Sequence, residues 1–283
     1  MIKEIVVDSQ FFCPKDTLEC GQIFRFFPIN EGYLVLSNDK ACIVMQKKDS
    51  AVICCDEADE DYFYNYFDLS TDYSAIYSRA QKSSYEILKK ASSMGKGVRI
   101  LRQNSEEMLI SFLISQNNNI PRIKKIINTL SEKLGEKKSF LGYEYYAFPT
   151  ATALANADDG LLKECGLGYR APYLKGLCKE IASNDLINRL VGLNEDALKK
   201  ELLSINGIGE KVANCALLFG FYKTKSFPVD VWIEKIYRED FGGKLTDRSK
   251  ITAFLIEEFA DDAGYFQQYL FYYKRSLEKQ LRN

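Results

Sequence analysis

The pattern of hydrophobic and polar positions changes about a quarter of the way along the chain. Before about residue 70, the short apolar runs GYLVLS, ACIVMQ and AVICC are separated by polar turn signals, which is typical of antiparallel strands. From about Asp72 onward, apolar residues recur at the spacing of amphipathic helices, almost to the end of the chain. We therefore predict an α+β fold, with a small antiparallel β domain over residues 1–95 and a helical domain over residues 96–283, whose last helix packs against both.

The composition narrows the classes of protein and of chemistry. None of the apolar runs approaches the length of a membrane span, and the first residues lack a signal-peptide pattern, so we expect a cytoplasmic protein. The net charge of −1 argues against a protein that coats nucleic acid, although Lys and Arg gather between residues 122 and 138. The eight cysteines form no C-x-x-C pair, and histidine is absent. Ser-His-Asp and Cys-His catalysis are thus excluded, which leaves Lys, Asp, Glu, Tyr or Cys for an enzyme.

The stretch LLSINGIGEKVANCALLF predicts two helices joined by a turn that contains two glycines. Gly207 and Gly209 permit a tight turn and a close approach by another molecule. The second helix begins at Gly209, so its unpaired amides and its positive dipole end suit a nucleic-acid phosphate. Lys211 lies in the first turn, where the dipole disfavours a cation and favours the neutral, nucleophilic amine. On that residue alone, an exposed surface lysine paired with Glu210 or with a phosphate is the commoner explanation.

Asp230 follows Pro228 in the segment FPVDVW and precedes a predicted helix. Pro228 keeps the preceding segment out of a helix, and Asp is a preferred N-cap residue. Capping explains Asp230 by itself, but a carboxylate held in this way could also face Lys211.

Together, NGIGEKVANCALLFG and FPVDVW resemble the helix-hairpin-helix, Gly-Pro-Asp (HhH-GPD) superfamily of base-excision DNA glycosylases. Four further stretches resemble its 8-oxoguanine DNA glycosylases with AP-lyase activity, of the two-domain type also found in eukaryotes: LECGQIFRF, SQNNNIPRI, GLGYRAPYL and GYFQQYLFYY. The resemblance covers nearly the whole chain. It implies removal of 8-oxoguanine opposite cytosine in duplex DNA, followed by β-elimination that nicks the strand.

The resemblance implies catalytic roles for Lys211 and Asp230. The Lys211 amine would attack the sugar C1′ as the glycosidic bond breaks and would form a Schiff base. Asp230 would help to position the amine and would stabilise the positive charge that develops on the sugar. The extruded base would occupy a pocket formed by Gly21, Cys215, Gln267 and Phe271.

The four pocket residues have distinct implied roles. Phe271 and Cys215 would sandwich the base, and Gln267 would read its Watson–Crick edge because an amide both donates and accepts. The carbonyl of Gly21 would accept a hydrogen bond from N7–H, a donor that 8-oxoguanine has and guanine lacks. Without the resemblance, Phe271 is more simply a core residue and Gly21 a turn residue.

The resemblance also implies DNA contacts outside the pocket, by Asn117, Arg122, Tyr169, Arg170, Gly207 and Gly209. The asparagine would fill the gap left by the extruded nucleotide, and both arginines would read the orphaned cytosine. The tyrosine would wedge beside the bases, and the two hairpin glycines would allow a phosphate to approach. Taken alone, the tyrosine is more simply a core residue.

The implied enzyme needs no organic cofactor and has no metal site made of side chains. Its last cysteine, Cys215, lies too early for the C-terminal iron–sulfur loop that is usual in endonuclease III-like glycosylases. A monovalent or calcium ion could still bind main-chain carbonyls of the hairpin, near Leu203, Ile205 and Ile208.

Two alternatives stay open: a glycosylase for another oxidised base, and a non-catalytic hairpin protein that only binds DNA. The second does not explain Lys211 together with Asp230, and an alkyl-base glycosylase would not need Lys211. Two residues depart from the family pattern: Trp232 stands where eukaryotic members commonly have a His, and Asn214 stands where an Asp is familiar. We expect a monomer that binds double-stranded DNA and no membrane, with binding that weakens as salt rises.

Overall fold

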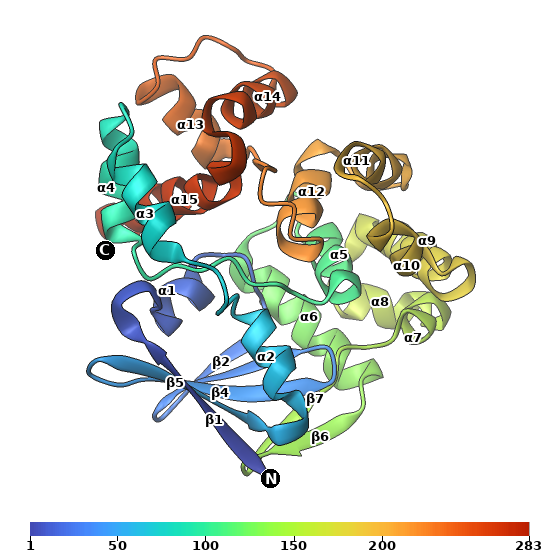
Figure 1. Ribbon diagram of the computed structural model, residues 1–283. Helices are drawn as coiled ribbons and strands as arrows, with labels where there is room; N and C mark the ends of the chain where they lie inside the picture. The colour runs from blue at the N-terminus through green and yellow to red at the C-terminus, as the bar shows by residue number, and fades with distance from the viewer. Residues whose placement is uncertain (283) are drawn as a thin grey trace. The chain divides into compact units, whose positions relative to one another are not determined.

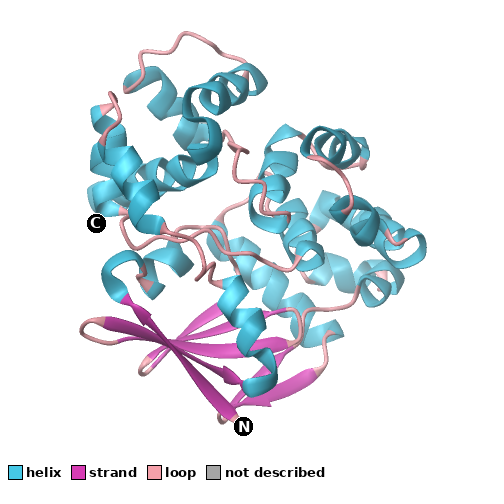
Figure 2. Cartoon of the chain, viewed as in Figure 1, coloured by secondary structure: helices cyan, strands magenta, loops and turns pink. Residues whose placement is uncertain are grey.

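The computed structural model describes the backbone of residues 1–282 and the side chains of residues 1–278. The chain forms two compact units, each assembled from segments that are distant in the sequence. Unit 1 comprises Met1–Gln22, Val44–Arg102 and Tyr222–Asn283, whereas unit 2 comprises Ile23–Ile43 and Gln103–Phe221. Figure 1 labels most of the helices and strands, and Figure 2 distinguishes helices from strands.

Strands dominate the first part of the chain, as the short apolar runs predict. They belong to an antiparallel sheet with the strand order β1-β5-β4-β3-β2, and the boundary of the units lies within β4. Ile5 of β1 lies opposite Ile53 of β5, and Phe27 of β2 lies opposite Leu34 of β3. The strands are β1 (Ile2–Asp8), β2 (Phe26–Ile29), β3 (Gly32–Ser37), β4 (Lys40–Gln46) and β5 (Ser50–Asp56).

Unit 1 contains two short helices where the pattern predicts only strands, and the prediction is wrong there. α1 begins with Pro14, whose fixed φ suits the first helical turn. α2 buries Phe63 and Tyr66 on one side, although it lies in an acidic stretch. The helices of unit 1 are α1 (Pro14–Glu19), α2 (Glu60–Tyr66), α3 (Tyr73–Gln81), α4 (Glu86–Met94), α13 (Val231–Glu239), α14 (Arg248–Phe259) and α15 (Ala263–Arg282), with 3-10 turns η1 (Ser9–Phe11), η2 (Glu57–Asp59) and η5 (Ala260–Asp262).

Unit 2 is mainly helical. Its helix α5 is buried at every position from Met108 to Ile114. A β-hairpin that the pattern did not predict pairs β6 (Lys137–Phe140) with β7 (Tyr143–Tyr146). The helices of unit 2 are α5 (Ser105–Ile114), α6 (Ile120–Leu134), α7 (Ala151–Asn156), α8 (Asp159–Glu164), α9 (Ala171–Asn184), α10 (Leu186–Val191), α11 (Glu195–Ser204) and α12 (Glu210–Cys215), with the 3-10 turn η3 (Gly168–Arg170) and the π-helical turn η4 (Ala216–Gly220).

A buried carboxylate organises the interior of unit 1. Asp68 is completely buried and accepts hydrogen bonds from the Tyr73 hydroxyl at 2.9 Å, from Nε of Arg102 at 2.8 Å and from the Tyr222 hydroxyl. The hydroxyls of Tyr222 and Tyr265 lie 2.9 Å apart. These donors compensate for the removal of the Asp68 charge from water. The cluster therefore joins the start of α3, the start of α15 and the segment that leads to α13.

The α+β class predicted from the sequence is confirmed by these elements. The domain boundary predicted near residue 95 stays a prediction, as does the packing of the last helix against both domains. None of the helices within residues 1–282 combines the length and the apolar character that a membrane span requires.

Candidate functional site

The turn between α11 and α12 forms the predicted helical hairpin in unit 2. Gly207 has a φ of 91°, and a Cβ atom there would lie 2.8 Å from Cβ of Tyr173. Only glycine fits this position without strain. Gly209 is the N-cap of α12, and a Cβ atom there would meet nothing within 4 Å. One glycine is thus required by packing, while the other leaves open space before the first amides of the helix.

Lys211 lies in the first turn of α12 and is half-buried, with Nζ 5.9 Å from the centre of the Phe112 ring. Its neighbour Glu210 forms a salt bridge with Lys199 at 3.2 Å. Within the described part of the chain, Lys211 itself forms no salt bridge. The explanation of Lys211 as a surface cation paired with Glu210 is therefore not the arrangement that the structure adopts.

The rest of α12 is buried and irregular. Asn214, where an Asp is familiar, is 2% exposed and donates from Nδ2 to the carbonyl oxygen of Glu210 at 2.8 Å. Cys215 is also buried, and the π-helical turn η4 follows it directly. Turns of this type occur frequently at functional sites.

Asn117, in the loop between α5 and α6, contacts two further residues predicted to bind DNA, Tyr169 and Arg170 of η3. Asn117 is exposed and has a positive φ of 45°. Its Nδ2 atom donates to the Tyr169 hydroxyl at 3.2 Å, and its carbonyl oxygen accepts a hydrogen bond from Arg170 at 3.0 Å. Tyr169 is 55% exposed, as a wedging residue would need to be, whereas Arg170 is 3% exposed. The guanidinium of Arg170 is thus used to hold the loop.

Arg122 lies at the start of α6, close to the same loop. Its guanidinium donates to the carbonyl oxygen of Gly166 at 3.2 Å, while the rest of the side chain is exposed. The basic stretch between residues 122 and 138 does not form a single face, because Lys137 and Lys138 lie in β6 and form salt bridges with Glu144 and Asp39.

Sequence reasoning missed Gln116, which lies between α5 and Asn117. Its Nε2 atom donates to the carbonyl oxygen of Gly207 at 2.6 Å. The partner lies 91 positions later, so local periodicity carried no signal for this contact. Only its place within the stretch SQNNNIPRI could have drawn attention to it.

Asp230 in unit 1 caps α13, as the sequence predicts. Its Oδ1 atom accepts hydrogen bonds from the main-chain amides of Trp232 at 2.9 Å and of Ile233 at 3.0 Å. Both bonds fix the orientation of the carboxylate at the helix N-terminus.

Gln267 and Phe271 lie one turn apart on α15, also in unit 1. Gln267 is 4% exposed and donates from Nε2 to the carbonyl oxygen of Pro228 at 3.3 Å. Its Oε1 atom is buried and accepts no hydrogen bond from any described residue. A buried acceptor without a partner is costly, which favours a ligand donor at this atom. Phe271 is half-buried.

Gly21 follows α1 with a φ of 102°, a left-handed conformation that favours glycine. Its neighbours Cys20 and Gln22 are completely buried. Gln268 of α15 donates to Sγ of Cys20 at 3.2 Å, so the turn at Gly21 contacts the helix that carries Gln267. Burial raises the pKa of Cys20 to about 11, so this thiol stays neutral and unreactive near pH 7.

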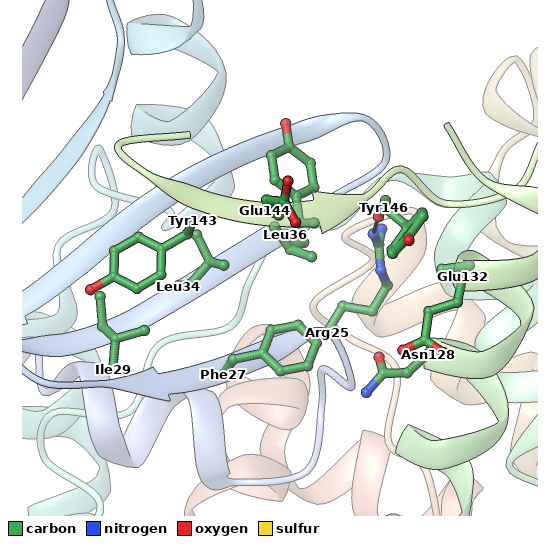
Figure 3. Close-up of a pocket in the computed structure, with 12 residues that line it drawn as sticks. Arg25, Phe27, Ile29, Leu34, Leu36, Asn128, Glu132, Tyr143, Glu144 and Tyr146 are labelled. Carbon is green, nitrogen blue, oxygen red and sulfur yellow. Dashed lines mark hydrogen bonds between the residues drawn. The ribbon is translucent and has the colours of Figure 1, made fainter. Parts of the chain in front are cut away.

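A separate pocket of about 300 Å³ lies in unit 2 (Figure 3). Its walls come from β2, β3, α6 and β7, with Phe27, Leu34, Asn128 and Tyr143 among the lining residues. None of the predicted site residues lines it. Among the residues that the structure describes, no group of three or more His, Cys, Asp or Glu side chains could hold a metal ion.

Known protein families match the chain in two consecutive stretches. Residues 4–109 match the 8-oxoguanine DNA glycosylase N-terminal domain, and residues 110–261 match the HhH-GPD superfamily of base excision DNA repair proteins. The probable N-glycosylase/DNA lyase of Methanothermobacter thermautotrophicus is 30% identical over 229 residues, which are 74% of this chain and 72% of that protein. The N-glycosylase/DNA lyase of Saccharomyces cerevisiae is 28% identical over 267 residues, which are 84% of this chain and 70% of that protein.

Solved structures resemble the chain over almost its whole length. The Clostridium acetobutylicum 8-oxoguanine glycosylase/lyase, in complex with double-stranded DNA containing cytosine opposite 8-oxoguanine, is 37% identical, with a TM-score of 0.90 and coverage of 98% of both chains. MBOgg1, in complex with a low-affinity DNA ligand, is 33% identical, with a TM-score of 0.92 and coverage of 98% of this chain and 99% of that chain. The chain therefore belongs to the 8-oxoguanine DNA glycosylase family of the HhH-GPD superfamily.

Proposed function

We propose that this protein removes 8-oxoguanine opposite cytosine from duplex DNA and then nicks the abasic site as an AP lyase. The observation that carries the proposal is its likeness, over 98% of both chains, to a glycosylase/lyase whose structure contains cytosine opposite 8-oxoguanine. Lys211 and Asp230 both lie in the stretch that matches the HhH-GPD superfamily.

Lys211 is the proposed nucleophile. Its neutral amine attacks C1′ of the damaged nucleotide while the bond from C1′ to N9 breaks, and the base leaves with the bonding electron pair and takes up a proton. The sugar ring then opens to give a Schiff base, which acidifies the C2′ proton. Loss of that proton expels the 3′ phosphate by β-elimination. The absence of a salt bridge at Lys211 in the described part of the chain supports this role.

Asp230 is proposed to stabilise the positive charge that develops on the sugar ring as the base leaves. A carboxylate that is held before the reaction needs little reorganisation to do this. The two main-chain amides that bind Oδ1 supply that orientation. Capping and charge stabilisation are therefore compatible in one residue.

The base-reading role is assigned to Gln267 and Gly21. N1–H and the amino group of 8-oxoguanine are donors, which suit the buried Oε1 atom of Gln267, because no described residue donates a hydrogen bond to it. The carbonyl of Gly21 is the proposed acceptor for N7–H, and the contact between Cys20 and Gln268 holds its turn against α15. Guanine lacks the N7–H donor, so it would leave this acceptor without a partner.

The contacts beside the orphaned cytosine are assigned to Asn117, Arg122, Tyr169 and Arg170, and a contact with a nearby phosphate is assigned to the hairpin. Asn117 and Tyr169 are exposed, which supports their proposed direct contacts with the duplex. Arg122 is also exposed and is proposed to read the orphaned cytosine. Arg170 would have to release the loop carbonyls to do the same, so its contribution also includes support of the loop.

The partner we propose is double-stranded DNA, bound by a monomer in the cytoplasm. The carbonyl groups at the end of α11, around Leu203 and Ile205, have no partners within the helix itself, which fits a loosely held monovalent or calcium ion. Ile205 also accepts the Ile208 amide at 3.0 Å, which closes the turn that would surround such an ion. Its charge would add to the attraction of the hairpin for phosphate.

Borohydride trapping tests the proposed function. A duplex with one 8-oxoguanine opposite cytosine is incubated with the protein and borohydride, which reduces a Schiff base to a permanent adduct. We expect an adduct with the natural sequence and none with Lys211→Gln. Release of the base without an adduct would contradict the lysine mechanism. The absence of both adduct and base release would contradict the substrate and favour the alternative of a DNA-binding protein without activity.

A further inference from the structure

Gln116 joins two segments of unit 2 that are far apart in the sequence. Its Nε2 atom donates to the carbonyl oxygen of Gly207 in the hairpin at 2.6 Å. Its own carbonyl oxygen accepts a hydrogen bond from Nε of Arg170 at 2.9 Å. The same guanidinium binds the carbonyl oxygen of Asn117 at 3.0 Å. Gln116 is therefore bonded to the hairpin through its side chain and to the Asn117 loop through its main chain.

Both ends of this connection are closely packed. The backbone of Gly207 packs so closely on Tyr173 that a Cβ atom would lie 2.8 Å away. The guanidinium of Arg170 is nearly inaccessible to water, because the side chain is 3% exposed. Asn117 keeps a positive φ of 45°, which is uncommon for a residue other than glycine and is maintained by these surroundings. A movement of the hairpin would therefore be transmitted to Asn117 through Gln116.

The amide of Gln116 is the group that this position requires. The acceptor on the hairpin side is a carbonyl oxygen, so the side chain must supply a donor. Leucine has a similar size and no donor. Gln116 is half-buried, so its replacement by leucine would remove the hydrogen bond that the Gly207 carbonyl oxygen accepts from it.

We infer that Gln116 is a positioning residue that couples the hairpin to the Asn117 loop, so that phosphate binding by the hairpin and gap filling by Asn117 occur together. The inference rests on the proposed function, because it requires both segments to contact the same duplex. Gln116 itself touches neither the sugar nor the extruded base in this scheme.

A double-mutant cycle tests the coupling. Asn117→Ala and Gly209→Asp are introduced singly and together into Lys211→Gln protein, and binding to a duplex with 8-oxoguanine opposite cytosine is measured. Each substitution raises Kd by some factor. With Gln116 present, we expect the factor for the double substitution to be about five-fold or more below the product of the two single factors, as for residues that act as one unit. In Gln116→Leu protein, we expect that product to hold within about two-fold.

Gln81→Leu provides the matched control. Gln81 of α3 also donates from Nε2 to a main-chain carbonyl, that of Lys89 at 2.9 Å, but it lies in unit 1. Its substitution removes that bond together with those to Oγ of Ser92 and of Ser93, and we expect the coupling to persist. Coupling that survives Gln116→Leu, or that disappears equally in Gln81→Leu, would overturn the inference.

The cycle also separates the inference from the proposed function. If both single substitutions weaken binding but their effects simply multiply with Gln116 present, the inference alone fails. If neither substitution weakens binding, the proposed DNA contacts are wrong and the inference fails with them.

Discussion

At the residue scale, Asp230 and Gln267 each serve the fold and the proposed chemistry together. Asp230 caps α13, and Gln267 donates to the carbonyl of Pro228, two positions before Asp230. The proposed base-reading amide thus contacts the segment that carries the proposed catalytic carboxylate. The sequence predicts the cap, because Pro followed by Asp before an amphipathic helix is a local signal. The unpartnered Oε1 atom of Gln267 has no such signal, since its surroundings come from distant segments.

Gln267→Met should separate stability from activity. Methionine has a similar shape and removes both the unpartnered buried acceptor and the weak 3.3 Å bond to Pro228. We expect the free energy of unfolding in urea to change by no more than about 1 kcal/mol. The single-turnover excision of 8-oxoguanine should fall by about ten-fold or more, because the edge of the base loses its partner. Normal excision by a stable Gln267→Met protein would exclude Gln267 from base reading.

At the element scale, glycine occupies the two positions of the hairpin for different physical reasons. Gly207 has a left-handed backbone and lies against Tyr173, so there is no space for a side chain at this position. Gly209 has a φ of −95°, which any residue can adopt, and there is open space for a side chain at this position. The sequence indicates the turn but cannot distinguish the two glycines, because the distinction depends on α9, which packs there.

The two hairpin glycines therefore predict opposite outcomes. Gly207→Ala should lower the free energy of unfolding by about 1–3 kcal/mol, because it adds strain and a clash. Gly209→Asp should leave it unchanged or raise it by a few tenths of a kcal/mol, roughly, since Asp is a good N-cap. The new carboxylate should nevertheless weaken duplex binding by about ten-fold or more through repulsion of phosphate. Urea unfolding measures the effect on stability, and a titration with duplex measures the effect on binding. Unaltered binding by Gly209→Asp would mean that the phosphate does not bind at the hairpin.

At the scale of the whole molecule, each unit is held together by contacts that cross long stretches of sequence. In unit 1, the Asp68 cluster joins residues 68–73, 102, 222 and 265. Burial, as the largest cause, raises the pKa of Tyr73, of Tyr222 and of Tyr265 above their ordinary value of 10.0. The nearby charge of Asp68 acts in the same direction.

These pKa shifts predict a loss of stability at alkaline pH. Below about pH 10 the three hydroxyls keep their protons in the folded and in the unfolded protein, so their full contribution to the free energy of unfolding is present. Above about pH 10 the unfolded chain releases these protons and the folded protein does not, so the free energy of unfolding falls as pH rises. We expect Tyr222→Phe to reduce this slope by about 1 kcal/mol per pH unit between about pH 9.5 and 11, as measured by urea unfolding. Tyr64→Phe, at an exposed tyrosine, is the control, and equal slopes in both variants would contradict the prediction.

The long helices and the strands β3, β4 and β5 were predictable from the sequence, whereas the shortest elements were not. Long helices such as α6 and α15 repeat their apolar face over several turns, so their periodicity is clear. α1, α2 and the β6–β7 hairpin span seven residues or fewer per element, which is too short for a reliable period. The acidic composition around α2 concealed a helix that buries only Phe63 and Tyr66.

The sequence by itself determined the class of fold and the residues available for the chemistry. These follow from local order: apolar periodicity, a Gly-x-Gly turn before Lys211, a Pro before Asp230, and the absence of histidine. Only the tertiary structure decided that Gln116 binds the hairpin, that Arg170 holds the Asn117 loop and that Gln267 retains a buried acceptor. Each of these depends on groups that lie tens of residues away, and the free energy of a hydrogen bond depends on whether burial has removed the competing water.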